Sequence, residues 1–116
     1  MESKQIIAAL EALAQESRLA VFRALVQAGP TGLTPGHLSE TLDLPSPTLS
    51  FHLAQLRHAG LVDATRDGRS LIYAANYTTM NGVIAFLTEN CCAGASCAPK
   101  PKEKSNEAPT RSRRRA

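Results

Sequence analysis

The chain has 116 residues, 43% of them apolar, and a formal net charge of +3. Its length supports one small domain, and this apolar fraction is enough for a hydrophobic core if a partner chain helps to cover it. The sequence shows no signal peptide and no apolar run of membrane-spanning length. We therefore expect a cytoplasmic protein, in a compartment where thiols stay reduced.

The positive charge belongs to the C-terminal end. Residues 99–116 contain seven basic and two acidic residues, whereas residues 1–98 have a net charge of −2. Because the end of the chain also lacks aromatic and branched aliphatic residues, residues 98–116 are predicted to form a disordered basic tail. The tail has two interpretations: an arm that binds DNA non-specifically, or a solvated extension without a role.

Three helices are predicted in the first part of the chain, over residues 3–14, 15–29 and 34–42. Gly29 is a suitable C-terminal cap for the second helix, and Thr34 is a suitable N-cap for the third. Apolar residues recur at helical spacing in each helix. Those expected to face inward are Ile6, Ile7, Leu10 and Leu13 in the first helix, Leu19, Val21, Phe22, Leu25 and Val26 in the second, and Leu38 and Leu42 in the third.

A fourth helix is predicted with Ser46 as its N-cap, Pro47 at its first position and Gly60 at its end. Its leucines, at positions 49, 53 and 56, have the spacing of one buried helical face. The opposite face is small, polar and mostly uncharged, with Pro47, Phe51, Ala54, Gln55 and His58.

A β-hairpin is predicted directly after this helix, with strands over residues 61–66 and 69–75 around an Asp67-Gly68 turn. A helix followed by a hairpin with Arg66 and Arg69 near its tip is typical of a winged helix-turn-helix. Such a helix fits the DNA major groove, and the hairpin arginines can reach phosphates or the minor groove. The candidate DNA-binding residues are Ser46, Pro47, Thr48, Ser50, Phe51, His52, Gln55, Arg66 and Arg69.

A last helix is predicted from Thr78, as its N-cap, to about Asn90. Its apolar residues are Met80, Val83, Ile84, Phe86 and Leu87. This apolar stripe is wider than a small domain needs for its own core. The helix is therefore interpreted either as simple core packing or, preferably, as part of a dimer interface.

The segment Thr48-Leu-Ser-Phe-His-Leu-Ala-Gln-Leu-Arg-His-Ala-Gly-Leu-Val62 resembles the recognition-helix signature of the ArsR/SmtB family of bacterial metal- and metalloid-responsive repressors. Ser17-Arg-Leu-Ala-Val-Phe-Arg-Ala-Leu25 is similar to another helix of that family, and the likeness extends from about residue 10 to residue 87. The resemblance implies a mainly α winged helix-turn-helix with a small β-hairpin. It also implies a homodimer through the first and last helices, with DNA half-sites about 10 base pairs apart.

All three cysteines, Cys91, Cys92 and Cys97, lie within seven residues just after the last helix. Thiolates select soft, thiophilic ions, and three of them match the charge of trivalent arsenic or antimony. Zinc would ordinarily require a fourth ligand. The pattern also resembles arsenic-responsive family members that have a vicinal Cys pair and a third Cys nearby.

Other uses of these thiols remain open. A disulfide between Cys97 and either Cys91 or Cys92 would make a redox or persulfide switch, and cadmium or lead would also bind thiolates. An organoarsenical would use two of the three sulfurs. Incidental cysteines are the least favoured interpretation.

The sequence thus predicts three regions: a DNA-binding and dimerisation domain over residues 1–92, an inducer site over residues 91–97, and the basic tail. The predicted function is a repressor that binds its double-stranded DNA operator without a constitutive cofactor and is released by As(III) or Sb(III). An enzyme is disfavoured because the chain lacks a phosphate-binding loop, paired catalytic acids and a convincing nucleophile–base pair. A thiol-rich metalloid buffer would not need a DNA-binding helix.

Overall fold

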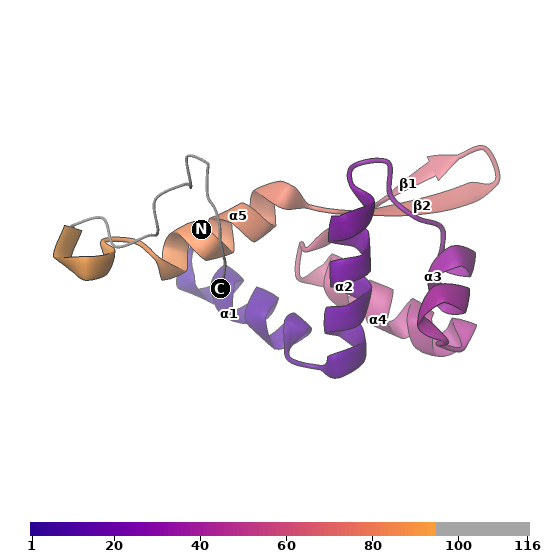
Figure 1. Cartoon of the computed structure of the whole chain (residues 1–116), viewed down its shortest axis with the longest axis horizontal. Coiled ribbons are helices and arrows are strands. Elements are labelled where there is room, and N and C mark those ends of the chain that lie inside the picture. The colour runs from indigo at the N-terminus through magenta and orange to yellow at the C-terminus, as the bar shows by residue number, and fades with distance from the viewer. Residues whose placement is uncertain (95–116) are drawn as a thin grey trace, which may run out of the picture.

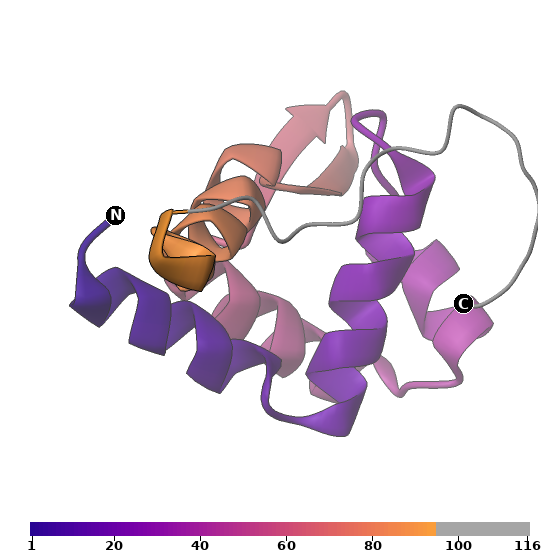
Figure 2. The same ribbon diagram turned by 60° about the vertical axis from the view of Figure 1, so that its left-hand side comes forward.

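The computed structural model describes residues 1–94, so Cys97 and the basic tail lie outside the described residues. Five α-helices and a two-stranded antiparallel hairpin are followed by a short 3₁₀ turn, in the order predicted from the sequence. The helices α1 and α5 lie side by side at one end of the molecule, and α2, α3, α4 and the hairpin occupy the other end (Figures 1 and 2). The elements are α1 Ser3–Leu13, α2 Glu16–Ala28, α3 Pro35–Leu42, α4 Ser46–His58, β1 Val62–Asp67, β2 Ser70–Ala75, α5 Tyr77–Leu87 and η1 Cys91–Gly94.

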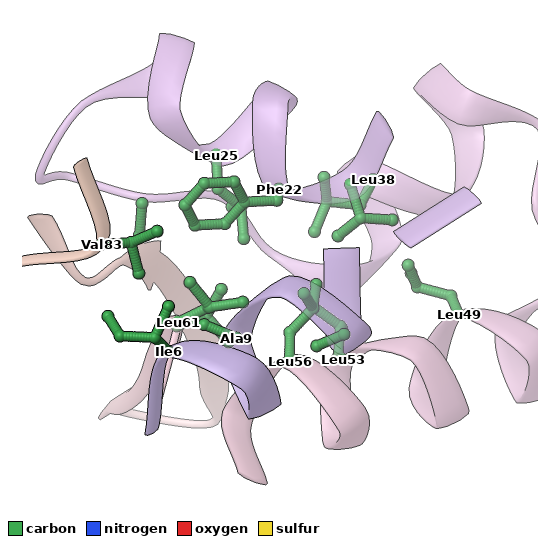
Figure 3. Packing of buried hydrophobic residues seen from close by; sticks show 14 residues of the cluster. Ile6, Ala9, Phe22, Leu25, Leu38, Leu49, Leu53, Leu56, Leu61 and Val83 are labelled. Atoms are coloured by element: carbon green, nitrogen blue, oxygen red, sulfur yellow. The ribbon is translucent and has the colours of Figure 1, made fainter. Parts of the chain in front are cut away.

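One hydrophobic core joins these elements (Figure 3). Leu25 of α2, Leu38 of α3 and Leu56 of α4 are fully buried at its centre, and Val83 connects α5 to it. The predicted buried face of the fourth helix is confirmed, since Leu49, Leu53 and Leu56 are all at most 1% exposed. Within residues 1–94, no helix is both long enough and apolar enough to cross a membrane.

Two predicted helix starts are wrong by one or two residues. The helix α4 begins at Ser46 itself, because the carbonyl of Pro45 already accepts the first helical hydrogen bond from the N–H of Leu49, at 2.9 Å. The helix α5 is capped by Asn76, whose side chain accepts from the N–H of Thr79 at 3.0 Å, and not by Thr78. Asn is an excellent N-cap, so the first suitable side chain in this stretch takes the role.

The end of α5 also differs from the prediction. The helix stops at Leu87, where the backbone leaves the helical conformation at Thr88, about one turn before the expected Asn90. The Thr88 hydroxyl donates to the carbonyl of Ile84 at 2.8 Å and satisfies one of the last helical acceptors. A separate 3₁₀ turn with both described cysteines then follows.

The hairpin is confirmed with its turn displaced by one residue. Asp67 pairs with Ser70, so the two loop residues are Gly68 and Arg69. Gly68 has a φ of 64°. A left-handed glycine at the first loop position is the pattern of a type II′ turn, which matches the twist of the strands. Arg69 therefore lies at the tip of the hairpin and Arg66 lies on β1.

A bridge to the helical layer fixes the hairpin. Leu33 and Tyr73 exchange both backbone hydrogen bonds, at 2.8 and 2.9 Å, so the loop between α2 and α3 adds a short third strand position to the sheet. Gly32 makes this approach possible, because its φ is +74° and a Cβ there would collide with the carbonyl oxygen of Tyr73.

A second apolar surface lies on the outside of α1 and α5. We call it the α1/α5 surface; its exposed members are Met1, Ile7, Leu10, Ile84 and Leu87. The prediction that all apolar residues of the first two helices face inward is therefore wrong for Ile7 and Leu10, and also for Leu19 of α2, which is 43% exposed. Helical spacing places residues on one face but does not tell which neighbour covers that face.

Candidate DNA-binding surface and thiol segment

The helix α4 presents two distinct faces. One packs into the core through Leu49, His52, Leu53 and Leu56, which follow the helical spacing of three and four residues. The other is exposed, and it carries most of the residues predicted to bind DNA. Those that are exposed are Ser46, Pro47, Thr48, Ser50, Phe51 and Gln55 on α4, together with Arg66 and Arg69 on the hairpin.

The prediction that His52 belongs to this exposed set is wrong. Its side chain is only 7% exposed, and its Nδ1 has no hydrogen-bond partner among the described residues. Burial, together with the positive charge of Arg18, lowers the pKa of His52 below the ordinary histidine value of 6.5. The neutral form of the imidazole is therefore favoured, and the side chain belongs to the buried face of α4.

Arg18 is a structural residue that the sequence analysis did not single out. Its Nε donates to the carbonyl of Ala12 at 2.6 Å and thereby closes the bend between α1 and α2. The only sequence signal for it is its place in the Ser17–Leu25 segment that resembles a family helix. Its position near His52 connects the start of α2 to the underside of α4.

The connection between α3 and α4 has the geometry of a helix-turn-helix. Asp43 ends α3 in the left-handed conformation, with a φ of 54°. Ser39 then closes the turn with two hydrogen bonds to Leu44. The backbone carbonyl of Ser39 accepts from the N–H of Leu44 at 3.0 Å, and the Ser39 hydroxyl donates to the carbonyl of Leu44. The direction of α4 relative to α3 is thus fixed by hydrogen bonds as well as by the core.

The electrostatics of this surface favour a polyanion. The helix α4 contains no acidic residue, and Arg57 and His58 lie in its last turn. Its N-terminal end carries the positive end of the helix dipole, with exposed hydroxyls at Thr48 and Ser50. The exposed Arg69 at the hairpin tip adds a cation on a neighbouring element. Hydroxyls, free helix N–H groups and arginines are the groups that ordinarily contact phosphates.

Gln55 lies at the edge of this surface. It lines a hollow of about 240 Å³ between α1 and α4 together with Glu11, Arg18 and His58. Gln55 thus lies between the exposed face of α4 and the helix α1. Pro47 and Phe51 lie in the N-terminal half of α4, away from this hollow.

The thiol segment begins one turn after α5. Cys91 and Cys92 are both exposed, and the N–H of Cys91 donates to the carbonyl of Thr88 at 3.1 Å. Asn90, Cys92 and Ala93 all have left-handed backbone conformations, with φ of 56° to 57°. These angles make the chain bend sharply where the two cysteines lie. For non-glycine residues each such angle costs on the order of 1 kcal/mol.

Of the three predicted thiol ligands, the described residues include Cys91 and Cys92, which are consecutive in the chain. Cys97 is outside the described residues, and within residues 1–94 there is no group of three or more His, Cys, Asp or Glu side chains arranged to hold a metal ion. A hollow of about 380 Å³ lies beside the last turns of α5, lined by Met1, Gly82, Phe86 and Glu89 among others.

The sequence and fold match known transcription regulators. A helix-turn-helix domain family model matches residues 13–64. The HTH-type transcriptional regulator YgaV of Escherichia coli is 31% identical over 90 residues, which make up 78% of this chain and 89% of YgaV.

Solved structures agree with this assignment. Reduced HlyU from Vibrio cholerae superposes with a TM-score of 0.61 at 32% identity, over 78% of this chain and 92% of HlyU. An ArsR family transcriptional regulator, RHA00566, gives a TM-score of 0.65 at 27% identity, over 78% of this chain and 90% of that protein. The chain therefore belongs to the ArsR family of winged helix-turn-helix transcriptional regulators, which are DNA-binding proteins and not enzymes.

Proposed function

We propose that the chain is a dimeric repressor that leaves its operator when trivalent arsenic or antimony binds the thiolates of Cys91, Cys92 and Cys97. The observation that carries this proposal is the clustering of every cysteine of the chain in seven residues, directly after the helix that bears the exposed apolar surface. Arsenite is a neutral trihydroxide, so three thiols displace three waters and form a neutral As–S₃ complex. Soft sulfur donors favour such an ion over hard cations.

The α1/α5 surface is proposed as the dimer interface. Its large apolar side chains, such as Ile84 and Leu87, are more than half exposed in the single chain. Large exposed apolar side chains on two neighbouring helices are typical of protein–protein contacts. The α1/α5 surface lies at the end of the molecule opposite to α3 and the hairpin (Figure 1). Two copies joined there would therefore present two α4 helices related by a two-fold axis.

DNA binding is proposed through the exposed face of α4 and the hairpin tip. Two α4 helices would enter successive major grooves, which predicts a two-fold operator with half-sites about 10 base pairs apart. The hydroxyls of Thr48 and Ser50 and the guanidinium groups of Arg66 and Arg69 would bind phosphates or base edges. His52 has no part in this contact, because it is buried.

The proposed coupling runs through α5. The thiol segment is hydrogen-bonded to the last turn of α5, from Cys91 to Thr88 and from Thr88 to Ile84. Gathering three sulfurs around one ion would reorganise the bend at Cys92, and so move the end of a helix in the proposed interface. The inducer must bind the DNA-free geometry more tightly by the same factor by which it weakens operator binding. A sharp switch requires a difference of about 5 kcal/mol.

A second candidate function is redox sensing by the same thiols. It is favoured by two observations: Cys92 is disulfide-bonded in this chain, and the relative HlyU, 32% identical, has a structure described as reduced. In this chain, oxidation would join Cys97 to Cys91 or Cys92 and require no metalloid. The two candidates share the DNA-binding surface and the dimer, and differ in the reagent that releases the operator.

The test is a fluorescence-anisotropy titration of the reduced protein on the DNA upstream of its own gene, with arsenite, antimonite, zinc, cadmium or diamide added separately. Release by arsenite or antimonite alone supports the proposal. Release by diamide alone supports redox sensing, and release by cadmium alone supports a divalent thiophilic ion. Absence of any sequence-dependent DNA binding overturns the regulator function altogether.

Single substitutions identify the ligands. Cys91→Ser, Cys92→Ser and Cys97→Ser should keep operator affinity and lose release by arsenite. Ser96→Ala is the matched control, because it alters the same segment without removing a sulfur. A cysteine whose substitution leaves release unchanged is not a required ligand. In vitro transcription from the same DNA then tests the sign of regulation, since the relative HlyU is named a transcriptional activator.

A further inference from the structure

Phe51 is the most conspicuous side chain on the exposed face of α4. It is 58% exposed, although a phenyl ring in water is unfavourable. Its neighbours three and four residues away along α4 are Pro47, Thr48, Ala54 and Gln55, and all of them are exposed. The ring therefore projects from an uncharged stretch of the helix.

The ring of Phe51 contacts a buried neighbour on one side. It meets the ring of His52 edge to face, with centroids 5.9 Å apart and planes inclined by 61°. His52 is buried, so this contact covers one side of the phenyl group and leaves the rest exposed.

The rest of the fold does not account for this exposed ring. Apart from Leu19 on α2, the other exposed large apolar side chains belong to Met1, α1 and α5. The helices α1 and α5 lie at the end of the molecule opposite to α3 (Figure 1). Phe51 is thus separate from the proposed dimer interface. It lies instead on the helix whose N-terminal end, hydroxyls and lack of acidic residues suit the DNA major groove.

The composition of α4 limits how it distinguishes bases. Residues 46–56 contain no Lys or Arg, so this part of the helix lacks the side chains that make bidentate contacts with guanine. Thymine is the base that presents an apolar group, its C5 methyl, in the major groove, and phenylalanine is suited to contact it.

We propose that Phe51 is a specificity-determining residue that recognises thymine in the operator half-site by contact with the C5 methyl group. This inference rests on the proposed use of α4 as the recognition helix. It adds the base class that is recognised and the atoms that make the contact. Pro47, one turn before Phe51, extends the same apolar strip along the groove.

The expected effect is measurable. Burying one methyl group changes affinity by about fourfold, and a two-fold dimer that loses one such contact in each half-site loses about fifteenfold. Replacing thymine by uracil removes only this methyl group and keeps every hydrogen-bonding group of the base pair. The loss is therefore attributable to the apolar contact.

The experiment selects an operator from a randomised duplex library and then measures affinity for versions in which each thymine is replaced singly by uracil. The wild-type dimer should lose about fourfold at one or two positions per half-site. Phe51→Ala should bind the thymine and uracil versions equally, and Phe51→Leu should retain part of the discrimination. Leu19→Ala, which removes another exposed apolar side chain from α2, should keep the full thymine-to-uracil ratio.

Two results would overturn the inference while leaving the regulator function intact: equal binding of both versions by the wild type, or unchanged discrimination by Phe51→Ala. Failure to select any operator would instead contradict the proposed DNA-binding function itself. The readout is a ratio of two affinities for one protein, so a general loss of affinity or dimerisation in a variant does not imitate the predicted effect.

Discussion

The buried imidazole of His52 should make the stability of the fold fall on mild acidification. Its pKa in the folded chain is lowered by burial and by the charge of Arg18. The unfolded chain keeps the ordinary value of 6.5 and therefore binds a proton at a higher pH than the folded chain does. Stability is thus fully present above pH 6.5 and is lost as the pH falls from 6.5 toward the lowered pKa.

The size of the effect has an upper limit. Between the two pKa values the free energy of unfolding decreases by at most about 1.4 kcal/mol per pH unit. At pH 5.5 the loss from this one group is therefore no more than about 1.4 kcal/mol. For a small domain, whose total stability is about 5–15 kcal/mol, such a change is easily measured.

Urea unfolding at fixed protein concentration between pH 7.5 and 5.5 tests this prediction, in a range where carboxylates stay ionised. His52→Gln should remove most of the slope, even if it also lowers stability at pH 7.5. His37→Gln is the matched control, since His37 is exposed on α3 and its substitution removes a histidine without altering the core. An identical slope in wild type and His52→Gln would refute the assignment of a neutral buried imidazole.

Three further changes test other parts of the structure. Gly32→Ala should lower the free energy of unfolding by more than about 1 kcal/mol in urea titrations, because of its positive φ and the collision of a Cβ with the Tyr73 carbonyl; a neutral effect would contradict the close approach. Asn76→Ala should cost about 1 kcal/mol by removing the cap on the N–H of Thr79, whereas Asn76→Ser should restore most of it. Leu87→Glu should shift the protein to monomers in sedimentation equilibrium without unfolding it, since Leu87 is 60% exposed; an intact dimer would place the interface elsewhere.

The order and type of the elements could be predicted because local signals agree with the fold. Pro35, Pro47 and Gly29 mark helix ends by backbone chemistry, and the leucine spacing of α4 matches its buried face. The error at the start of α5 arises where two capping residues stand close together. Asn76 and Thr78 are both suitable caps, and only the path of the chain after β2 decides between them.

The burial of His52 could have been found from the sequence. Positions 49, 52, 53 and 56 form the complete helical pattern for one face, and His52 occupies a core position of it. The prediction placed His52 among the DNA-binding residues because an imidazole can donate to or accept from base edges and phosphates. The exposure of Leu19, Ile7 and Leu10 could not have been found in this way, because an apolar residue awaiting a partner chain has the same spacing as one in the core.

If the cysteines form the inducer site as proposed, the packing indicates how their signal would reach the DNA. The N-terminal end of α5 is fixed, since the Tyr77 hydroxyl donates to the carbonyl of Val26 at 3.1 Å. Within α5, residues 77–87, Val83 is the only buried side chain, whereas Ile84 and Leu87 face outward. The C-terminal half of α5 is thus held more weakly by its own chain than α4 is.

This difference favours motion between subunits over rearrangement within one. The leucines of α4 are almost completely buried in a close-packed core, which resists small displacements. A change at Cys91 and Cys92 would therefore be absorbed where resistance is least, at the outward face of α5. If that face is the dimer interface, the two α4 helices change their spacing as rigid bodies, and operator affinity falls although neither DNA-binding surface is altered.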